Sequence, residues 1–403
     1  MSGAPNGKDR LSARGLLAFF AGFSAWTFDA FDFFVLTYVL PDVAHEFHRS
    51  VPEVAATLTA TLVMRPVGAF VFGLLADRWG RRIPLMIDIV FYSAMEILSG
   101  LAPTYKVFFL LRLLYGVGMG GAWGVSASLA LESVPVKWRG ILSGFLQEGY
   151  ATGNLLAAFA FRAILPHWGW RKMFFVGAAP ALLTLLVLLF VEESDAWKAA
   201  AAARKSWGEY FGAIAENWKR FLYLVLLMAM MNFMSHGTQD LYPTFLRLER
   251  HFDASATFWI SVISMIGAIV GGVLVGLCSD KFGRRKAMVT SALLGLLVIP
   301  LWVSAPTVGM VALGAFLIQF MVQGAWGVIP AHINELSPSI ARGFLPGLAY
   351  QVGVLIAADT PRFQSASANY FGYAKTMAVF AATVFIVGAI VIGSGPEAHR
   401  KEF

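Results

Sequence analysis

The sequence has few charged residues and almost no cysteine. Charged side chains make up 14% of the 403 residues, 58% are hydrophobic, and the mean hydropathy is +0.67. A soluble protein of this length would carry a far more polar surface, so the composition excludes a water-soluble fold. Cys278 is the only cysteine, and an internal disulfide is therefore excluded as well.

The sequence also lacks the motifs of membrane proteases and ATP-driven pumps. It contains no H-E-x-x-H, no G-x-S-x-G and no G-x-x-x-x-G-K-S/T loop. We therefore predict that the protein is not an enzyme and uses no cofactor and no metal. The net charge of +7 does not indicate a nucleic-acid partner, because the basic residues are scattered over the ends of apolar segments and form no basic face.

In place of these motifs, the sequence has twelve apolar stretches long enough to cross a bilayer, which takes about 20 residues. They lie near residues 15–40, 53–76, 83–101, 106–131, 139–165, 171–191, 220–246, 255–279, 287–304, 308–334, 342–358 and 371–393. The first stretch follows a basic N-terminus and has no small-residue cleavage site after a short core, so we expect an uncleaved span. The predicted fold class is an all-α membrane protein with twelve transmembrane helices in two six-helix bundles.

Lysine and arginine are about twice as frequent in the loops on one side of these spans as on the other. The richer side holds both termini, and the positive-inside rule places it in the cytoplasm. We therefore expect a multi-pass protein of the inner membrane. Its predicted parts are a cytoplasmic N-tail (1–14), an N-terminal bundle (15–191), a cytoplasmic linker (192–219), a C-terminal bundle (220–393) and a cytoplasmic C-tail (394–403).

An internal repeat supports the division into two bundles. GLLADRWGRR at 73–82 recurs as GLCSDKFGRR at 276–285, and each half also has GAWGV followed by a Glu, a Pro and an Arg-Gly pair. Asp280 follows Asp77 by 203 residues, and Arg342 follows Arg139 by the same 203 residues. Parallel halves of six spans are expected where two bundles rock around a site near the membrane midplane.

The repeated motif resembles the loop between the second and third helices of the major facilitator transporters. The resemblance covers essentially the whole chain and implies a charge latch at the cytoplasmic side that holds the outward-facing state. The residues implied are Asp77, Arg81, Glu132 and Arg139 in the first half and Asp280, Arg284, Glu335 and Arg342 in the second. We expect these ion pairs to lie at a wet, solvent-exposed rim on the cytoplasmic side, where breaking them costs little free energy. The alternative is that they only set topology and cap helices.

Ionisable residues also occur deep within the predicted spans, where each costs at least ~2.5 kcal/mol unless it is paired or faces a cavity. Asp29 and Asp32 are spaced to share one helix face, and Arg65 lies roughly 18 Å from the cytoplasmic Asp77 at 1.5 Å per residue. Glu148 falls in the fifth span, and the seventh carries NFMSHGTQD. A deep arginine near carboxylates and a histidine predicts an anionic substrate bound by Arg65 and a coupling proton on a neighbouring group.

The seventh span resembles more narrowly the Jen-type monocarboxylate:proton symporters of the sialate:proton symporter family. Asn232, Ser235, His236, Thr238, Gln239, Asp240 and Thr244 match their pattern N-x-x-S/T-H-x-S/T-Q-D-x-x-x-T, and the AYQ segment at 349–351 matches as well. The resemblance implies proton-coupled uptake of a small carboxylate such as lactate, pyruvate or acetate. It implies substrate binding by Arg65, Asn232, His236, Tyr350 and Gln351, with Asp240 in the proton pathway.

Several alternatives stay open at this stage. The proton carrier is among Asp29, Asp32, Glu148, His236 and Asp240. Asp29 could instead neutralise Arg65, and His236 could be a packing residue. Arg112 could help coupling or anchor its helix, and Asp88 and Glu96 have no assigned role. The substrate could also be sialic acid, an aromatic acid or, with less support, a sugar. We expect a small organic anion, a proton and the lipid bilayer as partners of a monomeric protein, and no nucleic acid.

Overall fold

The computed structural model describes residues 11–49, 51–202 and 207–397, and these form helices joined by short turns. The helices are α1 (Ala13–Glu46), α2 (Val51–Trp79), α3 (Arg82–Gly100), α4 (Tyr105–Glu132), α5 (Arg139–Gln147), α6 (Gly149–Phe190), α7 (Asp195–Ala202), α8 (Trp207–Glu216), α9 (Trp218–Gln239), α10 (Tyr242–Leu248), α11 (Ala254–Phe282), α12 (Arg284–Ser304), α13 (Val308–Leu336), α14 (Leu345–Ala357), α15 (Thr360–Phe371) and α16 (Tyr373–Ser394). Two short 3-10 turns, η2 (Val136–Trp138) and η3 (Ser339–Ala341), precede α5 and α14.

Nine helical segments of the described chain are long and apolar enough to cross a membrane. The fifth, sixth and eleventh predicted spans are not among these nine. The fifth is broken at Glu148, between α5 and α6, and the turn at Gly169, whose φ of 71° suits glycine, separates the fifth span from the sixth within α6. The eleventh is broken between α14 and α15, where Pro361 restarts the helix. With these counted, the predicted fold of twelve spans is confirmed, but the eleventh extends to Phe371 rather than ending near 358.

Glycines allow the neighbouring helices of each bundle to approach closely. A Cβ at Gly120 of α4 would stand 1.9 Å from the carbonyl oxygen of Arg65 on α2, and one at Gly116 would stand 2.2 Å from that of Thr61. The second half uses the same device, because a Cβ at Gly271 of α11 would stand 2.2 Å from the carbonyl oxygen of Phe320. In a lipid bilayer the hydrophobic effect does not drive helices together, so van der Waals contacts between closely spaced backbones stabilise the bundle. The close contact at Gly120 also sets the position of Arg65 on α2.

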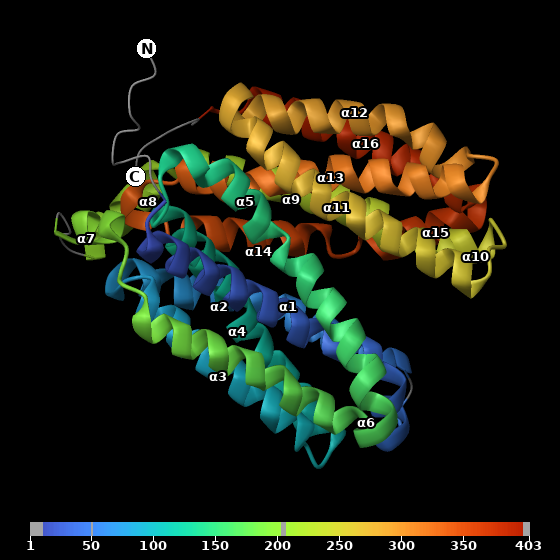
Figure 1. Cartoon of the computed structure of the whole chain (residues 1–403), viewed down its shortest axis with the longest axis horizontal. Helices are drawn as coiled ribbons and strands as arrows, with labels where there is room; N and C mark the ends of the chain where they lie inside the picture. Colours follow the sequence, from blue (N-terminus) through green and yellow to red (C-terminus); the bar gives the residue numbers. More distant parts are fainter. Residues whose placement is uncertain (1–10, 50, 203–206, 398–403) are drawn as a thin grey trace.

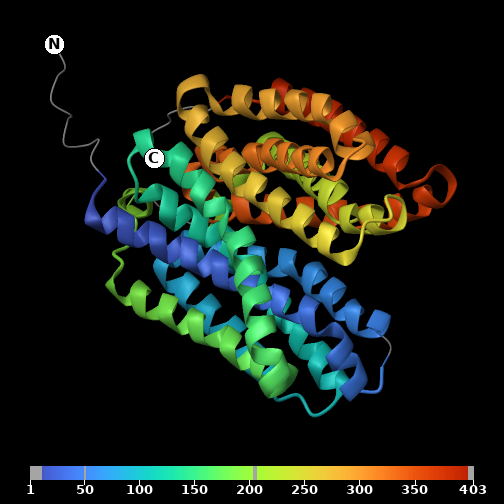
Figure 2. The same ribbon diagram turned by 45° about the vertical axis from the view of Figure 1, so that its right-hand side comes forward.

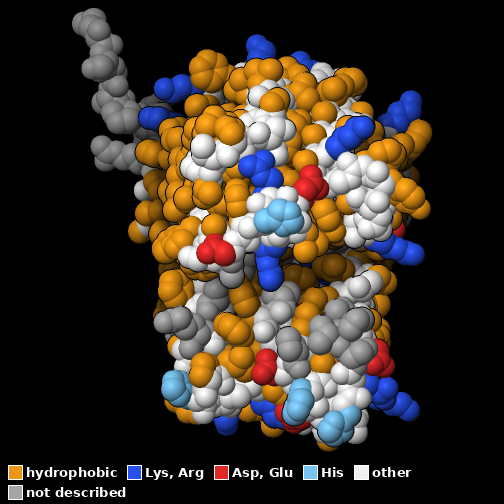
Figure 3. All heavy atoms as spheres, turned by 90° about the vertical axis from the view of Figure 1, so that its right-hand side faces the viewer, with side chains coloured by type: hydrophobic (Ala, Val, Ile, Leu, Met, Phe, Trp, Pro, Cys, Tyr) orange, Lys and Arg blue, Asp and Glu red, His pale blue; other side chains and the backbone are white. Residues whose placement is uncertain are grey.

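The two bundles meet at one end and separate towards the other (Figures 1 and 2). At the closed end α5 packs on α11 and α13, and α14 packs on α2 and α4. The linker helices α7 and α8 and the ends of the described chain lie at this closed end (Figure 1). Figure 3 looks onto the opposite end, where histidine and charged side chains lie on both sides of a hollowed seam between the bundles.

The boundaries of the tails, bundles and linker stay predictions. The predicted linker at 192–219 contains α7 and α8, and α9 begins at Trp218, within its last residues. Trp197 of α7 donates a hydrogen bond from Nε1 to the carbonyl oxygen of Asp77 at 2.9 Å. The linker is therefore attached to the closed end of the N-terminal bundle.

Candidate functional site: a central cavity between the bundles

Two adjoining pockets of about 270 and 330 Å³ form a cavity between the bundles, which we call the central cavity. Both pockets are lined by residues from the two halves, including Phe34, Gln147 and Tyr150 from the first and Gln239 and Gln323 from the second. A cavity shared by two bundles is reshaped whenever the bundles move relative to each other. This is the place where a carrier can bind its substrate.

Arg65 supplies the positive charge of the cavity. It lines the pocket, yet its side chain is only 3% exposed. Its Nε and Nη2 atoms have no hydrogen-bond partner in the described part of the chain. Its guanidinium lies over the ring of Tyr350, with Cζ 5.5 Å from the ring centre. Arg65 therefore has free donors next to the cavity, and a guanidinium in this state can bind a carboxylate through two parallel hydrogen bonds.

The polar residues of the seventh span form the wall provided by α9. Asn232, His236 and Asp240 all line the cavity. The Asn232 side chain donates a hydrogen bond to the carbonyl oxygen of Met228 at 2.8 Å, and His236 Nδ1 lies 2.9 Å from Asp240 Oδ2. The histidine and aspartate side chains are each 31% exposed. Both side chains of this pair are therefore accessible from the cavity.

Glu148 lies at the junction of α5 and α6, facing the second bundle. Its side chain lines the cavity and is 5% exposed, and Oε1 has no partner among the described residues. A Cβ at Gly272 of α11 would stand 2.2 Å from that oxygen, so the glycine leaves room for the carboxylate at the seam. Movement of α11 relative to α5 would change the surroundings of Glu148 directly.

Three predicted site residues do not line the central cavity. Gln351 is 1% exposed and its amide points towards the carbonyl oxygen of Gly120 across the seam, at 3.4 Å. Asp29 and Asp32 are fully buried inside the N-terminal bundle. Asp29 forms neither a hydrogen bond nor a close ion pair with Arg65 within the described ranges, and the two interact only electrostatically at longer range. The helix rotation that brings Phe34 to the cavity turns both carboxylates away from it.

Sequence reasoning missed two glutamines of α13. Gln319 accepts a hydrogen bond from Gln239 at 2.7 Å, and Gln323 donates one to Ser235 at 3.4 Å. Both line the cavity. A signal was present, because the positions 203 residues earlier are the packing glycines Gly116 and Gly120. The second half therefore has an amide side chain where the first half has a packing glycine. Such a difference between the halves is expected at a substrate-binding site.

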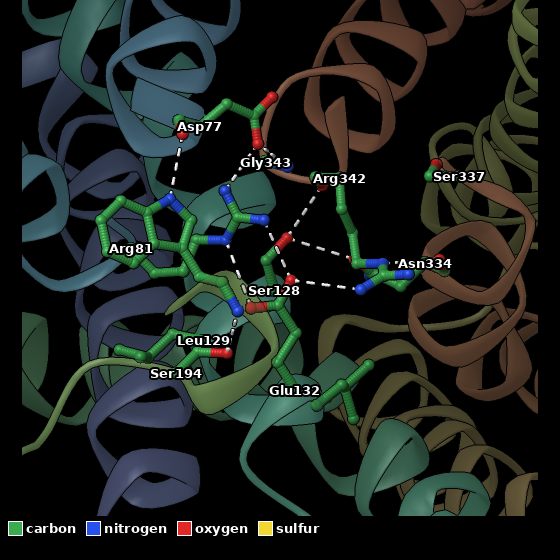
Figure 4. Close-up of polar contacts among 12 residues, drawn as sticks. Asp77, Arg81, Ser128, Leu129, Glu132, Ser194, Asn334, Ser337, Arg342 and Gly343 are labelled. Atoms are coloured by element: carbon green, nitrogen blue, oxygen red, sulfur yellow. Dashed lines mark hydrogen bonds and ion pairs between the residues drawn. The ribbon is translucent and has the colours of Figure 1, made fainter. Parts of the chain in front are cut away.

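The predicted latch of the first half is assembled at the closed end (Figure 4). Arg81 pairs with Asp77 at 2.6 Å and with Glu132 at 3.0 Å. Asp77 also accepts hydrogen bonds across the seam, from the backbone nitrogens of Gly343 at 2.7 Å and Phe344 at 3.1 Å. These nitrogens lie at the start of α14, where the helix dipole favours a negative charge. The contact therefore joins one bundle to the other.

The latch of the second half repeats this arrangement. Arg284 pairs with Asp280 at 2.8 Å and with Glu335 at 3.0 Å, and Asp280 accepts from the backbone nitrogen of Gly140 at 3.1 Å. Arg342 lies 3.7 Å from Glu132, and Arg139 donates to the carbonyl oxygen of Leu131 at 3.2 Å.

The expectation of a wet rim is wrong. The side chains of Arg81, Glu132, Arg284 and Glu335 are at most 1% exposed. The closed end excludes water from these pairs. Removing one partner of a buried pair leaves an uncompensated buried charge and costs about 3–5 kcal/mol, so a single substitution in the latch should destabilise its bundle more than one in a surface pair.

Two pseudo-symmetric helical bundles that close around a shared polar cavity define a membrane carrier. The family model described as "Sugar (and other) transporter" matches residues 17–203 and 228–396, and the chain belongs to this family. The "Carboxylic acid transporter protein homolog" of Saccharomyces cerevisiae is 29% identical over 95% of this chain and 68% of its own length. "Sialic acid transporter NanX" of Escherichia coli is 28% identical over 92% of this chain and 94% of its own.

Among solved structures, the major facilitator proton:xylose symporter XylE bound to 6-bromo-6-deoxy-D-glucose superposes with a TM-score of 0.75. The identity is 19%, with 96% of this chain and 97% of XylE covered, so the likeness concerns the fold. The predicted resemblance to the major facilitator transporters is confirmed, and the protein is a multi-pass membrane transporter rather than an enzyme.

Proposed function

We propose that the protein is a proton-coupled symporter of a small organic carboxylate such as lactate, pyruvate or acetate. The observation that carries the proposal is the buried Arg65 guanidinium, which has unpartnered Nε and Nη2 atoms beside the central cavity. Burying a guanidinium with unsatisfied donors is costly. A substrate carboxylate would remove that cost. The carboxylic acid and sialic acid transporters among its relatives support an organic acid as the substrate class.

The proton follows from the charge that the carboxylate brings. Binding an anion at Arg65 adds one negative charge to a cavity that already holds the carboxyl groups of Glu148 and Asp240. A proton on Glu148 or on the His236–Asp240 pair offsets that added charge before the bundles close over the site. The energy of closure then depends on both ligands being present, which is thermodynamic coupling.

The orientation is part of the proposal. We infer from the excess of basic residues that the end with the termini is cytoplasmic. A monomer in the inner membrane is part of the same proposal. The described conformation, closed at that end by the two latches, is then the outward-facing state. In this state the central cavity receives substrate and proton from outside.

Uptake into proteoliposomes tests the proposal. Labelled lactate, pyruvate, acetate and sialic acid are offered under an imposed inside-alkaline pH gradient to the wild type and to Arg65→Gln. We expect gradient-driven uptake of a small monocarboxylate that falls at least tenfold in the variant. Arg49→Gln is the matched control, since Arg49 is exposed and its contacts with Glu53 and the Tyr105 ring lie at the surface, away from the central cavity. Carboxylate uptake that survives Arg65→Gln would overturn the role of the arginine.

One observation favours a second candidate, a larger planar acid. Five aromatic side chains line the part of the cavity next to Arg65: Phe33, Phe34, Tyr150, Trp326 and Tyr350. Aromatic walls bind flat apolar bodies well, so benzoate belongs in the same uptake series. Benzoate uptake that exceeds lactate uptake and requires Arg65 would favour the aromatic acid. Uptake of a neutral sugar that is insensitive to Arg65→Gln would favour a sugar porter.

A further inference from the structure

Four carboxylates lie together inside the N-terminal bundle, away from the central cavity. They belong to Asp29 and Asp32 of α1 and to Asp88 and Glu96 of α3, and all four side chains are 0% exposed. Of their eight oxygens, seven have no hydrogen-bond partner in the described part of the chain; Glu96 Oε2 is the exception. An ionised carboxylate without a donor is among the most costly groups to bury. We call this set the acid cluster.

Arg112 of α4 is the cation within the cluster. Its Nη2 lies 2.6 Å from Glu96 Oε2, and its Nε and Nη2 also donate to Ser99. Asp32 interacts electrostatically with Arg112 and with Glu96, so the two acids compete for one cation. The second nearby cation is Arg65, which acts on Asp29. Two arginines therefore face four carboxylates, and neutrality requires two protons.

A tyrosine and a glycine complete the cluster. The Tyr92 hydroxyl is fully buried, has no partner within the described ranges and interacts with all four carboxylates. At Gly177 of α6, a Cβ would stand 2.3 Å from Asp32 Oδ1 and 3.5 Å from Glu96 Cγ, so the glycine makes room for both acids. The titratable and charged groups facing the cluster are Asp29 and Asp32 of α1, Arg65 of α2, Asp88, Tyr92 and Glu96 of α3, and Arg112 and Tyr115 of α4.

The second half of the chain has no counterpart of this cluster. The positions 203 residues after Asp88, Glu96 and Arg112 are Ser291, Ile299 and Ala315. The latch residues, by contrast, recur at the same offset. If the cluster only supported helix packing, the second bundle, which is built on the same plan, would need it too. Its restriction to one half indicates a task that the two halves do not share.

We propose that Asp88 is a proton-holding residue of this carrier and that Glu96 is a positioning residue that keeps Arg112 engaged, so that Asp32 also holds a proton. Arg65 links the cluster to the cavity. When a substrate carboxylate engages Arg65, Asp29 loses its counter-charge, and the cluster takes up one more proton from water. The role of the protons in transport rests on the proposed function, whereas their presence on Asp88 and Asp32 does not.

Infrared spectroscopy of the purified full-length protein tests the proposal without any substrate. Protonated carboxyl groups have a C=O stretch distinct from that of carboxylates. At neutral pH we expect Asp88→Asn to lose the signal of one protonated carboxyl. Glu96→Gln should also lose one, because Arg112 is then free to stabilise Asp32 as a carboxylate. Glu53→Gln, at an exposed position, is the control that should lose none.

Transport supplies a second readout. In proteoliposomes, Asp88→Asn should lower gradient-driven accumulation at least tenfold relative to carboxylate exchange, since exchange needs no net proton movement. If Asp88→Asn misfolds, Asp88→Ser introduces the residue found at the matching position, Ser291. An unchanged infrared signal in both Asp88 variants would overturn the proposal. If the wild type carries no carboxylate, the proposed function fails, while the infrared result still decides whether Asp88 holds a proton.

Discussion

The two latches differ in how strongly they join the bundles, and this predicts unequal effects of matched substitutions. A contact biases the conformational equilibrium when it is made in one state and lost in the other, as a contact across the seam is when the bundles separate. The pair of Arg81 and Asp77 lies within one bundle and moves with it. Asp77 accepts two backbone hydrogen bonds across the seam. From across the seam, the backbone nitrogen of Gly140 donates to both oxygens of Asp280.

Asp77→Asn should shift the population towards the state open at the end with the termini. An asparagine keeps one acceptor oxygen and loses the charge, so about one charge-assisted hydrogen bond of ~1.5–3 kcal/mol disappears. At 1.36 kcal/mol per tenfold change, this corresponds to a shift of about 10- to 150-fold. Asp280→Asn keeps an acceptor oxygen for the Gly140 nitrogen across the seam, so we expect a shift below about tenfold, less than that of Asp77→Asn.

Distances between spin labels across the opposite end measure the shift. Cysteines replace the exposed Lys106 and Arg247 in a Cys278→Ser background, and double electron–electron resonance gives the fraction of molecules with the short distance. That fraction should rise in Asp77→Asn and rise less in Asp280→Asn. A shift of less than threefold in Asp77→Asn, or a larger one in Asp280→Asn, would refute the reasoning.

Two further predictions concern stability. Gly120→Ala should lower the melting temperature and abolish uptake, because its Cβ would overlap the carbonyl oxygen of Arg65 at 1.9 Å and overpacking costs about 1–3 kcal/mol; Gly309→Ala, which meets nothing within 4 Å, should change neither. Burial tends to raise the pKa of Glu46, but hydrogen bonds from Arg171 and a tryptophan outweigh it and hold that pKa below its usual range. Glu46 contributes less than about 1 kcal/mol to the stability of the folded protein, because the site is exposed. Since the folded-state pKa is depressed, this contribution is present above the unfolded-state pKa and is lost as the pH falls through the folded-state pKa. The melting temperatures of the wild type and Glu46→Gln should therefore differ at neutral pH and converge in acid; a difference that grows in acid would contradict this.

The sequence by itself determined the membrane class, the twelve spans, the two halves and the members of both latches. These features depend on local apolar runs and on a repeat with a constant offset, and both can be read without knowing how helices face each other. Arg65 and the α9 residues could be predicted as deep polar groups for the same reason, since the cost of burying them is known from composition alone.

Only the tertiary structure decided which deep residues share a space. Asp29, Asp32 and Phe34 are neighbours on one helix, yet rotation of α1 directs the acids to α3 and α4 and the phenylalanine to the central cavity. The burial of the latches was likewise a result of packing, because the closeness of two bundles depends on glycines that meet a partner helix far away in sequence. Local pattern fixes depth along a helix, whereas the direction in which a side chain points is set by the helices packed around it.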